Sequence, residues 1–448
     1  MLCRFSHGRY LFQKIRYVQT SSIFEGLMIP ANRKNKVVTA SDAVELICSN
    51  DTVCVSGFVS QGSPDAILQE LRFRYEREGQ PQDLTLLFGG GPGDWCDRGL
   101  NHLARVPSDS ECATLPLVKR AIGAHYGQTP ELAALAISNK IEAWTLPLGS
   151  ISRMIRAQAT HSPGHITTVG LGTYVDPDTG TGGAVNDLAK SSPVQKTLVT
   201  KFGSLDQEYL MYKALPIQVA IIRATTADAS GNLSFEDESL LCDQKITAMA
   251  ARNSGGVVIA QVKQLCAVGS LPARSVHIPG AMVDCVVVVK EEDHDYLHPM
   301  SFESRHDPVL TSQIKTPADE IQKMPLTERK IISRRASFSL KPDKCINLGI
   351  GLPEGVAAVA SEEGMLRFVT LTTEPGVFGG LPAPGRQFGP ASNADALIEM
   401  NQMFDFYDGG GLDQCFLGAA QINEKGDVNV SRLSMDRLTG KFTLYMIY

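Results

Sequence analysis

The sequence lacks an apolar run long enough to cross a bilayer. Its longest runs, such as the one around 283–289, fall far short of the roughly 20 residues that a membrane helix needs. It also lacks any C-x-x-C pair among its ten cysteines, which favours separately packed, reduced thiols over a disulfide framework or a zinc site. Basic residues do not outnumber acidic ones, 42 against 48, so no broad basic field indicates nucleic acid. We therefore expect neither a membrane nor a nucleic acid as partner.

The first 35 residues differ from the rest in charge. Before Asp42 the only acidic residue is Glu25, and on a helix Leu11, Ile15 and Val18 share one apolar face. A basic, acid-poor, amphipathic leader is typical of a mitochondrial transit peptide, so we predict one at 1–35 and a mitochondrial matrix location, with the cytoplasm as the alternative. The other interpretation is a basic tail, with Met28 as the true start. The basic residues are Arg4, Arg9, Lys14, Arg16, Arg33, Lys34 and Lys36.

The remaining chain alternates short apolar runs with stretches of helical spacing. At 448 residues it is too long for one hydrophobic core, so two domains are expected. Nearly continuous apolar strands are buried on both faces, as in a parallel sheet covered by helices, and the fold class is α/β. A helix is predicted over 63–77, opened by Ser63 as N-cap and Pro64. The predicted strands are 51–58, 84–88, 217–223, 256–262, 284–289, 345–349, 369–373 and 414–421.

Between these two series of elements the pattern breaks. Residues 291–318 are polar, rich in Pro, His and Asp, and without clear period, so we expect a solvated interdomain linker. Three histidines among acids (His294, His298 and His306) raise a metal site as the alternative, although their spacing matches no ligand pattern. The predicted organisation is a first α/β domain at 36–290, a linker at 291–325 and a second α/β domain at 326–432, its first helix at 326–340.

Several predicted strands end in glycine-rich turns. Such turns bare backbone N–H groups where open α/β sheets hold ligands. Each alone fits an ordinary turn, but their number favours a ligand that carries phosphates or forms an oxyanion. The segments are 56–64, 89–94, 170–173, 347–353 and 408–411.

The sharpest segment is Leu371 to Pro382, in which Glu374 ends an apolar strand and Pro375-Gly376 follows at once. A carboxylate buried there without a partner would cost several kcal/mol. The turn sequence therefore predicts that Glu374 is exposed at the strand tip beside bare amides. A surface turn glutamate without function is the alternative.

Taken together, these segments resemble the family I coenzyme A-transferases, in the branch of propionate and acetate/acetoacetate CoA-transferases. The resemblance extends from about Lys36 to Arg432. Several independent motifs occur in the family's order, which makes the resemblance specific. Besides the glutamate segment, the matching stretches are 57–65, 172–177, 223–228, 235–238, 347–354 and 404–413.

The resemblance implies a nucleophile at Glu374 and oxyanion-binding backbone amides at Gly410 and Gly411. It implies that the N-terminal segment closes over the reacting carbonyl from the other domain. Coenzyme A is then a substrate and part of a covalent intermediate, with no permanently bound cofactor and no metal. Short carboxylic acids (acetate, propionate, acetoacetate or succinate) and their acyl-CoA thioesters are the implied partners, and a homo-oligomer is expected. The implied substrate- and CoA-binding residues are Gly57, Phe58, Gly62, Asn347, Gly349, Gly351, Gly379 and Gly380.

This chemistry suits a glutamate. An ionised carboxylate attacks a thioester without a general base, and one well-placed oxyanion donor lowers the barrier by about 2.7–4 kcal/mol. Because the thioester energy is conserved, neither ATP nor metal is needed. A thioesterase side activity would arise if water reached the glutamyl thioester.

Two alternatives stay open at this point. The glycine turns also raise a dinucleotide-binding oxidoreductase, although no G-x-G-x-x-G opens a helix with an acid about 20 residues later. The other alternative is an inactive, truncated isoform that binds CoA or pairs with full-length subunits. It arises because the tail at 433–448 does not resemble the family. We expect a second domain short of strands to be less stable, since uncovered parallel sheets expose apolar faces and edges.

Overall fold

The computed structural model describes the chain from residue 35 to residue 438 with short gaps. All but the last residue of the predicted leader at 1–35, together with His294 and most of the 433–448 tail, therefore lie outside the described residues. Within the described part, no helix combines the length and the hydropathy of a membrane span. The gaps are 108–113, 205–206, 291, 293–295, 297, 299, 301–302, 304, 318–322, 420, 430–431 and 435–436.

A nine-stranded sheet forms the first unit, with strand order β1-β12-β11-β9-β2-β3-β4-β5 and β10 beside β9. All its pairs are parallel except β9–β10. The central β9 is buried at every position, as expected for a strand covered on both faces. The strands are β1 (Val37–Val38), β2 (Thr52–Val55), β3 (Leu84–Phe88), β4 (Val118–Gly123), β5 (Glu142–Thr145), β9 (Val219–Asp228), β10 (Leu233–Ser234), β11 (Val257–Cys266) and β12 (Cys285–Val288).

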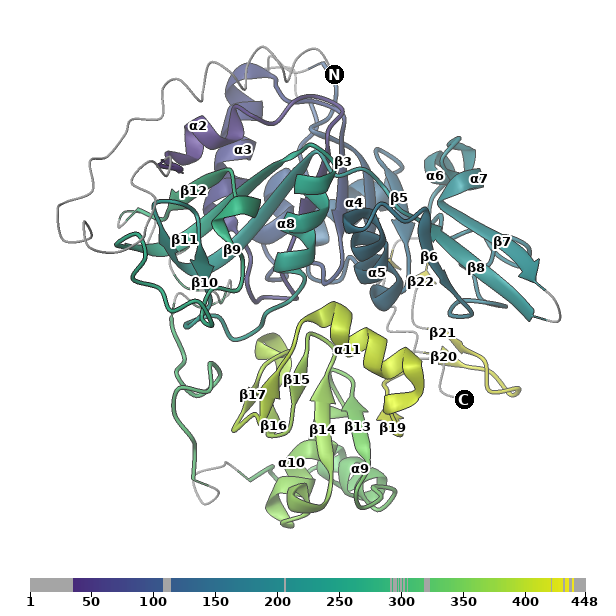
Figure 1. Ribbon diagram of the computed structural model, residues 1–448. Helices are drawn as coiled ribbons and strands as arrows, with labels where there is room; N and C mark the ends of the chain where they lie inside the picture. The colour runs from purple at the N-terminus through teal and green to yellow at the C-terminus, as the bar shows by residue number, and fades with distance from the viewer. Residues whose placement is uncertain are drawn as a thin grey trace.

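Helices cover both faces of this sheet (Figure 1). One core contains apolar residues of α2 (Ala40–Val44), α3 (Asp65–Glu78) and α4 (Pro130–Ile137). The other contains those of α5 (Leu148–Ala159) and α8 (Gln244–Asn253). Two apolar layers on one sheet are the arrangement that the continuous apolar strands predicted.

An antiparallel sheet at the side of the first unit was not predicted from the sequence. Its order is β6-β8-β7, and Figure 1 shows it projecting beyond β5 with two short helices above it. Its strands contain exposed and half-buried polar residues, so no clear period marks them. The elements are β6 (Gly164–Thr167), α6 (Asp187–Ser191), α7 (Gln195–Leu198), β7 (Val199–Ser204) and β8 (Gln207–Lys213).

The second unit is built on a five-stranded sheet of order β18-β15-β14-β13-β19. Strand β13 is parallel to β14 and β19, whereas β15 is antiparallel to β14 and β18. Figure 1 shows helix α11 between this sheet and the first unit. The elements are α9 (Glu328–Ser337), β13 (Cys345–Leu348), α10 (Glu354–Glu362), β14 (Thr370–Thr373), β15 (Val377–Phe378), β18 (Ala396–Leu397), α11 (Met400–Phe406), a π-helical turn (Tyr407–Gly411) and β19 (Gln414–Phe416).

Shorter elements complete the described chain. Three two-stranded ribbons follow or interrupt the second sheet, and 3-10 turns connect several longer elements. The remaining elements are η2 (Gly99–Leu103), η3 (Gly280–Met282), η6 (Leu366–Phe368), η7 (Gly385–Gln387), β16 (Leu381–Pro382), β17 (Ala391–Ser392), β20 (Gln421–Ile422), β21 (Val428–Asn429), β22 (Arg432–Ser434) and β23 (Arg437–Leu438).

The fold class is confirmed as α/β with a mainly parallel central sheet, whereas the sheet of the second unit is mixed; three further details differ. Ser63 does not cap α3: its hydroxyl donates to the Asp65 carboxylate instead, and Pro64 is the N-cap. The expected strand 414–421 is interrupted: β19 ends at Phe416, and the next strand, β20, begins at Gln421. The segment 291–318 is not simply solvated, since Met300 is buried in a small apolar cluster with Ala383 of the second unit. A segment that runs between two packed units gains free energy by burying such side chains.

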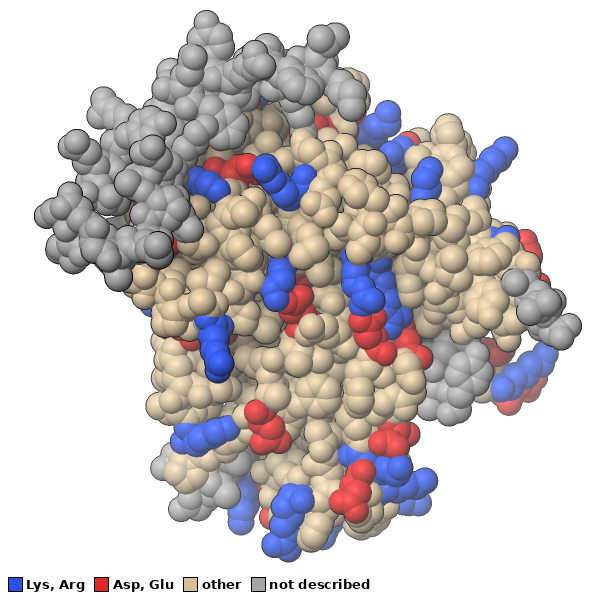
Figure 2. Space-filling view, viewed as in Figure 1, with Lys and Arg blue, Asp and Glu red and all other residues tan. Residues whose placement is uncertain are grey.

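Charged side chains are interspersed over the face shown in Figure 2. Lysine and arginine alternate there with aspartate and glutamate rather than gathering into one field. A mixed surface of this kind gives no electrostatic footprint for a polyanion on that face.

Candidate functional site

Glu374 directly follows β14, in a turn closed by the bond from the Gly376 amide to the Thr373 carbonyl oxygen. The sequence predicted an exposed carboxylate here, and this was wrong: only 3% of Glu374 is exposed. The reason is tertiary, because the end of β14 faces the segment after α11. Burial raises the pKa of Tyr407 far above its ordinary value and the Glu374 charge raises it further. Burial also raises the pKa of Cys415 to about 11, again with a contribution from Glu374.

A buried polar network stands beside Glu374. The Tyr407 hydroxyl donates to Thr372 Oγ1 at 2.6 Å. The Asn347 amide nitrogen donates to the Thr372 carbonyl oxygen at 3.3 Å and to the Tyr407 hydroxyl at 3.4 Å. These bonds tie β13, β14 and the π-helical turn together two residues before Glu374. Asn347 was predicted for this region, whereas Tyr407 was missed, although it lies inside the matching stretch 404–413.

The glycine turn begins two residues after Tyr407. Gly410 has a φ of 97°, a left-handed conformation that glycine adopts without strain. A Cβ on Gly410 would meet no atom within 4 Å, whereas one on Gly411 would overlap the Phe406 ring. Open space beside the Gly410 backbone is compatible with the predicted oxyanion role, while packing alone requires glycine at 411.

The N-terminal glycine segment reaches the second unit. Its loop is closed by the Phe58 amide, which donates to the Gln61 carbonyl oxygen at 2.9 Å. The ring of Phe58 lies 6.2 Å from that of Phe388, and the next residue, Gly389, accepts a hydrogen bond from Thr373 Oγ1. Phe58 of the first unit is thus linked, through 388–389, to the residue before Glu374.

Buried polar side chains contact this loop or lie next to the residue that does. Ser239 Oγ donates to Gln61 Oε1 at 2.9 Å. The Arg223 guanidinium pairs with Glu238 at 3.0 Å, and both side chains are almost fully buried. These residues fall within or beside stretches that carried the resemblance, 223–228 and 235–238. Sequence reasoning did not assign them a role, because an ion pair between a buried strand and a loop 15 residues further along the chain leaves no local pattern.

The other predicted glycines have distinct places. Gly349 follows β13, and its amide donates to the Phe416 carbonyl oxygen of β19 at 2.9 Å. Gly351 lies in the turn before α10. Side chains at Gly379 and Gly380 would overlap Asp395 and the Ser392 backbone, so close backbone packing explains these two glycines. Gly62 ends the loop that Phe58 begins. The binding roles of these glycines stay predictions.

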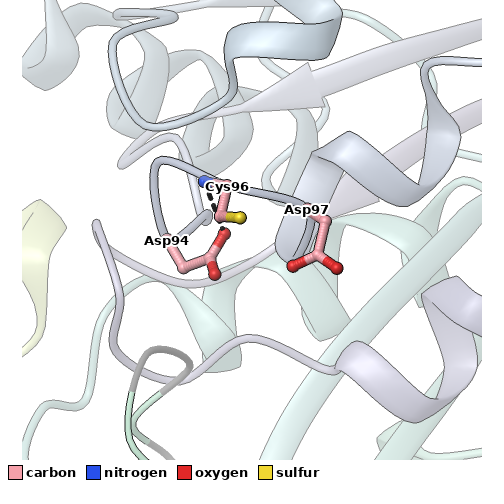
Figure 3. A group of neighbouring side chains, drawn as sticks. All are labelled: Asp94, Cys96 and Asp97. Carbon is pink, nitrogen blue, oxygen red and sulfur yellow. Dashed lines mark hydrogen bonds between the residues drawn. The ribbon is translucent and has the colours of Figure 1, made fainter.

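Among the described residues, one group of three potential metal ligands lies together, formed by Asp94, Cys96 and Asp97 (Figure 3). Asp94 Oδ1 already accepts the backbone amides of Cys96 and Arg98, each at 3.0 Å. The negative charges of Asp97 and Asp94 raise the pKa of the Cys96 thiol, which disfavours the thiolate that a metal would need. We interpret the group as the polar side of a turn.

Comparison with known protein families identifies the class of protein to which this fold and these motifs belong. Residues 37–289 match the family described as Coenzyme A transferase. The chain belongs to this family and, like the relatives described below, is an enzyme of the transferase class. This confirms the resemblance and removes the dinucleotide-binding oxidoreductase as an alternative.

Particular relatives are similar along nearly the whole chain. Caffeate CoA-transferase of Acetobacterium woodii is 37% identical over 409 residues, which are 90% of this chain and 75% of that protein. Acetate CoA-transferase YdiF of Escherichia coli K12 is 36% identical over 406 residues, 90% of this chain and 72% of that protein. The crystal structure of the acyl-CoA transferase YdiF apoenzyme from E. coli O157:H7 has a TM-score of 0.82 and 33% identity, covering 92% of this chain and 74% of that one. A second YdiF structure is a thioester complex with CoA, with a TM-score of 0.81, 33% identity, and coverage of 92% and 78%.

The predicted mitochondrial matrix location is wrong. These relatives, at 36–37% identity, come from bacteria, which have no mitochondria. The prediction rested on the basic, acid-poor composition of the first 35 residues and on one apolar helical face, and these features do not distinguish a targeting leader from other basic segments.

Proposed function

We propose that this enzyme transfers coenzyme A from a short-chain acyl-CoA to a short-chain carboxylate through a glutamyl–CoA thioester on Glu374. The observation that carries the proposal is the position of Glu374. It is a buried carboxylate at the end of a central strand, beside the glycine turn and close to the loop that the first unit contributes. The YdiF thioester complex with CoA supports it, because its protein shares 33% identity and the same fold.

The proposed reaction has two halves. A Glu374 carboxylate oxygen attacks the thioester carbonyl, the C–S bond breaks, and a mixed anhydride and CoA thiolate result. The thiolate attacks the glutamyl carbonyl and displaces the first acid, which leaves a glutamyl–CoA thioester. The acceptor carboxylate then runs the same steps in reverse. In each tetrahedral intermediate we assign the Gly410 amide, and the Gly411 amide with it, to the oxyanion.

Acetate, propionate, acetoacetate and succinate are the proposed acids, in keeping with the acetate specificity that the name of YdiF gives. The caffeate specificity named for the A. woodii relative makes caffeate the matched test of acid size. Saturation kinetics for the short acids and none for caffeate are expected; the reverse order would contradict the short-chain class.

The direct test is mass spectrometry of the Glu374 peptide after incubation with acetyl-CoA alone. A mass increase equal to CoA minus water, lost on addition of acetate, is expected for the wild type and not for Glu374→Gln. A folded chain that forms no adduct and transfers no CoA would favour the alternative of an inactive isoform.

Steady-state kinetics test the order of events. Because the first acid leaves before the second attacks, double-reciprocal plots at several acceptor concentrations are expected to be parallel. Lines that intersect would show that both substrates are bound at the same time. That result would contradict the release of the first acid before the second attacks.

A further inference from the structure

One arginine of the first unit reaches the helix that carries the glycine turn. Arg153 lies on α5, which packs against α11 of the second unit (Figure 1). Its Nε donates to Asp405 Oδ1 at 3.0 Å and its Nη1 donates to Asp408 Oδ2 at 2.6 Å. Its Nη2 donates to the carbonyl oxygen of Phe404. The Arg153 side chain therefore contacts three residues, Phe404 and Asp405 in α11 and Asp408 directly before Gly409.

This contact differs from an ordinary surface ion pair. Only 10% of the Arg153 side chain is exposed, and removing such a cation from water costs several kcal/mol unless its hydrogen bonds are replaced. The fork of donors on a guanidinium meets that requirement at all three nitrogens, which the single ammonium of a lysine cannot do. Arg156, one turn later, contacts Asp405 but is half exposed, and exposed ion pairs of this kind contribute little to stability.

The anchored segment leads directly to the proposed site. The Phe404 carbonyl lies in the last turn of α11, where a cation interacts favourably with the helix dipole. Asp408 immediately precedes Gly409, and the Tyr407 hydroxyl donates a hydrogen bond to Thr372 in β14, the strand that Glu374 directly follows. Arg153 thus fixes where α11 ends and in which direction the glycine turn leaves it. A displacement of about 1 Å in catalytic geometry can cost about 10²-fold in rate.

We infer that Arg153 is a positioning residue for CoA transfer: it holds the 408–411 turn against the first unit, so that groups from both units form one site. The inference rests on the proposed function, because it assigns the turn to the reacting carbonyl. Arg153 acts on the turn through Phe404, Asp405 and Asp408. Its effect is expected on the rate of the chemical step and not on acyl-CoA binding.

The experiment compares Arg153→Lys and Arg153→Gln with Arg156→Gln, the matched control on the same helix and with the same partner, Asp405. Both Arg153 variants are expected to lower kcat at least 10-fold with the KM for acetyl-CoA changed less than about 2-fold, and Arg153→Lys the less severely. Arg156→Gln is expected to stay within about 2-fold of the wild type in both constants. Single-turnover formation of the Glu374 adduct should slow by the same factor as kcat.

The outcomes separate this inference from the proposed function. If the wild type forms no CoA adduct on Glu374, the proposed function fails. If the wild type forms it and folded Arg153→Gln forms it equally fast, the inference is overturned. It is also overturned if kcat falls only in proportion to the folded fraction measured by thermal unfolding. Should Arg153→Gln not fold, Asp408→Asn decides: it keeps the other two arginine contacts, and an unchanged kcat would overturn the inference.

Discussion

Burial and ionisation make opposite demands on Glu374. Burial disfavours the charged carboxylate, whereas attack on a thioester requires it. The structure places this side chain at a strand end, where the backbone turns, rather than in the middle of an apolar strand. The exclusion of water that burial brings also protects the proposed thioester from hydrolysis. A 3% exposed glutamate is therefore what a covalent mechanism needs.

Substitution of Glu374 tests this residue directly. We expect Glu374→Ala to abolish transfer, because no carboxylate remains to form the anhydride. Glu374→Asp is expected to lose about 10²-fold in kcat, since the nucleophile retreats by about 1 Å. CoA transfer is measured with acetyl-CoA and succinate, and Glu374→Gln serves as the isosteric control. Wild-type turnover by folded Glu374→Ala would remove Glu374 from the mechanism.

At the scale of elements, the site depends on how α11 and its π-helical end are held against the second sheet. The Tyr407 hydroxyl connects that end to β14, and Asn347 adds the bond from β13. A glycine-rich turn has little intrinsic rigidity, so its position is set by what flanks it. Tyr407 on the sheet side and Arg153 on the side of the first unit supply that constraint.

Tyr407→Phe removes one hydroxyl and leaves the ring. We expect this variant to lose about 1–3 kcal/mol of stability, because buried partners are left unsatisfied, and to lower kcat about 10-fold through displacement of the turn. Urea unfolding and steady-state kinetics measure the two effects.

The matched control is Tyr126→Phe. The Tyr126 hydroxyl is also buried and donates to the Ala121 and Trp144 carbonyl oxygens, each at 3.0 Å, within the first unit. This variant is expected to lose stability but keep its rate. Equal rates for both variants would show that Tyr407 does not act on the site.

At the scale of the whole molecule, the two units meet through buried polar groups as well as apolar ones. Asp243, at the start of α8, accepts a hydrogen bond from Ser152 Oγ at 2.7 Å and one from the backbone of Asn401 in α11. Lys245 pairs with Glu399 across the same boundary. Burial, with a smaller contribution from the Glu399 charge, raises the pKa of Asp243 to about 7, although the hydrogen bonds from Ser152 and from the Asn401 backbone oppose this rise.

This pKa predicts how stability depends on pH. Between about pH 4 and pH 7 the folded protein keeps the Asp243 proton that the unfolded chain releases, so the contribution is present at low pH and is lost as pH rises through 7. We expect Asp243→Asn, which stays neutral, to reduce the fall in melting temperature between pH 5 and pH 8. Calorimetry at the two pH values measures it. An unchanged difference would mean that Asp243 does not titrate in this range.

Much of the framework could be predicted because its signals are local. The strand at 84–88 was predicted with both ends correct, since a run of buried apolar residues between polar turns has few alternatives. The β6-β8-β7 sheet was missed because its half-exposed strands alternate too weakly. The exposure of Glu374 was predicted wrongly for a different reason: what covers a strand end belongs to another part of the chain.

The sequence by itself determined the α/β class, the family and the position of Glu374 at a strand end. Each of these three features depends on residues close together in the sequence: the spacing of apolar residues, the residues typical of turns, and short motifs. Only the tertiary structure decided that Glu374 is buried, that Tyr407 and Asn347 stand beside it, and that Arg153 reaches Asp408, which is 255 residues further along the chain. Contacts of that separation arise when two packed units exclude water between them, and the energetic cost of burying a charge then selects partners that no local pattern reveals.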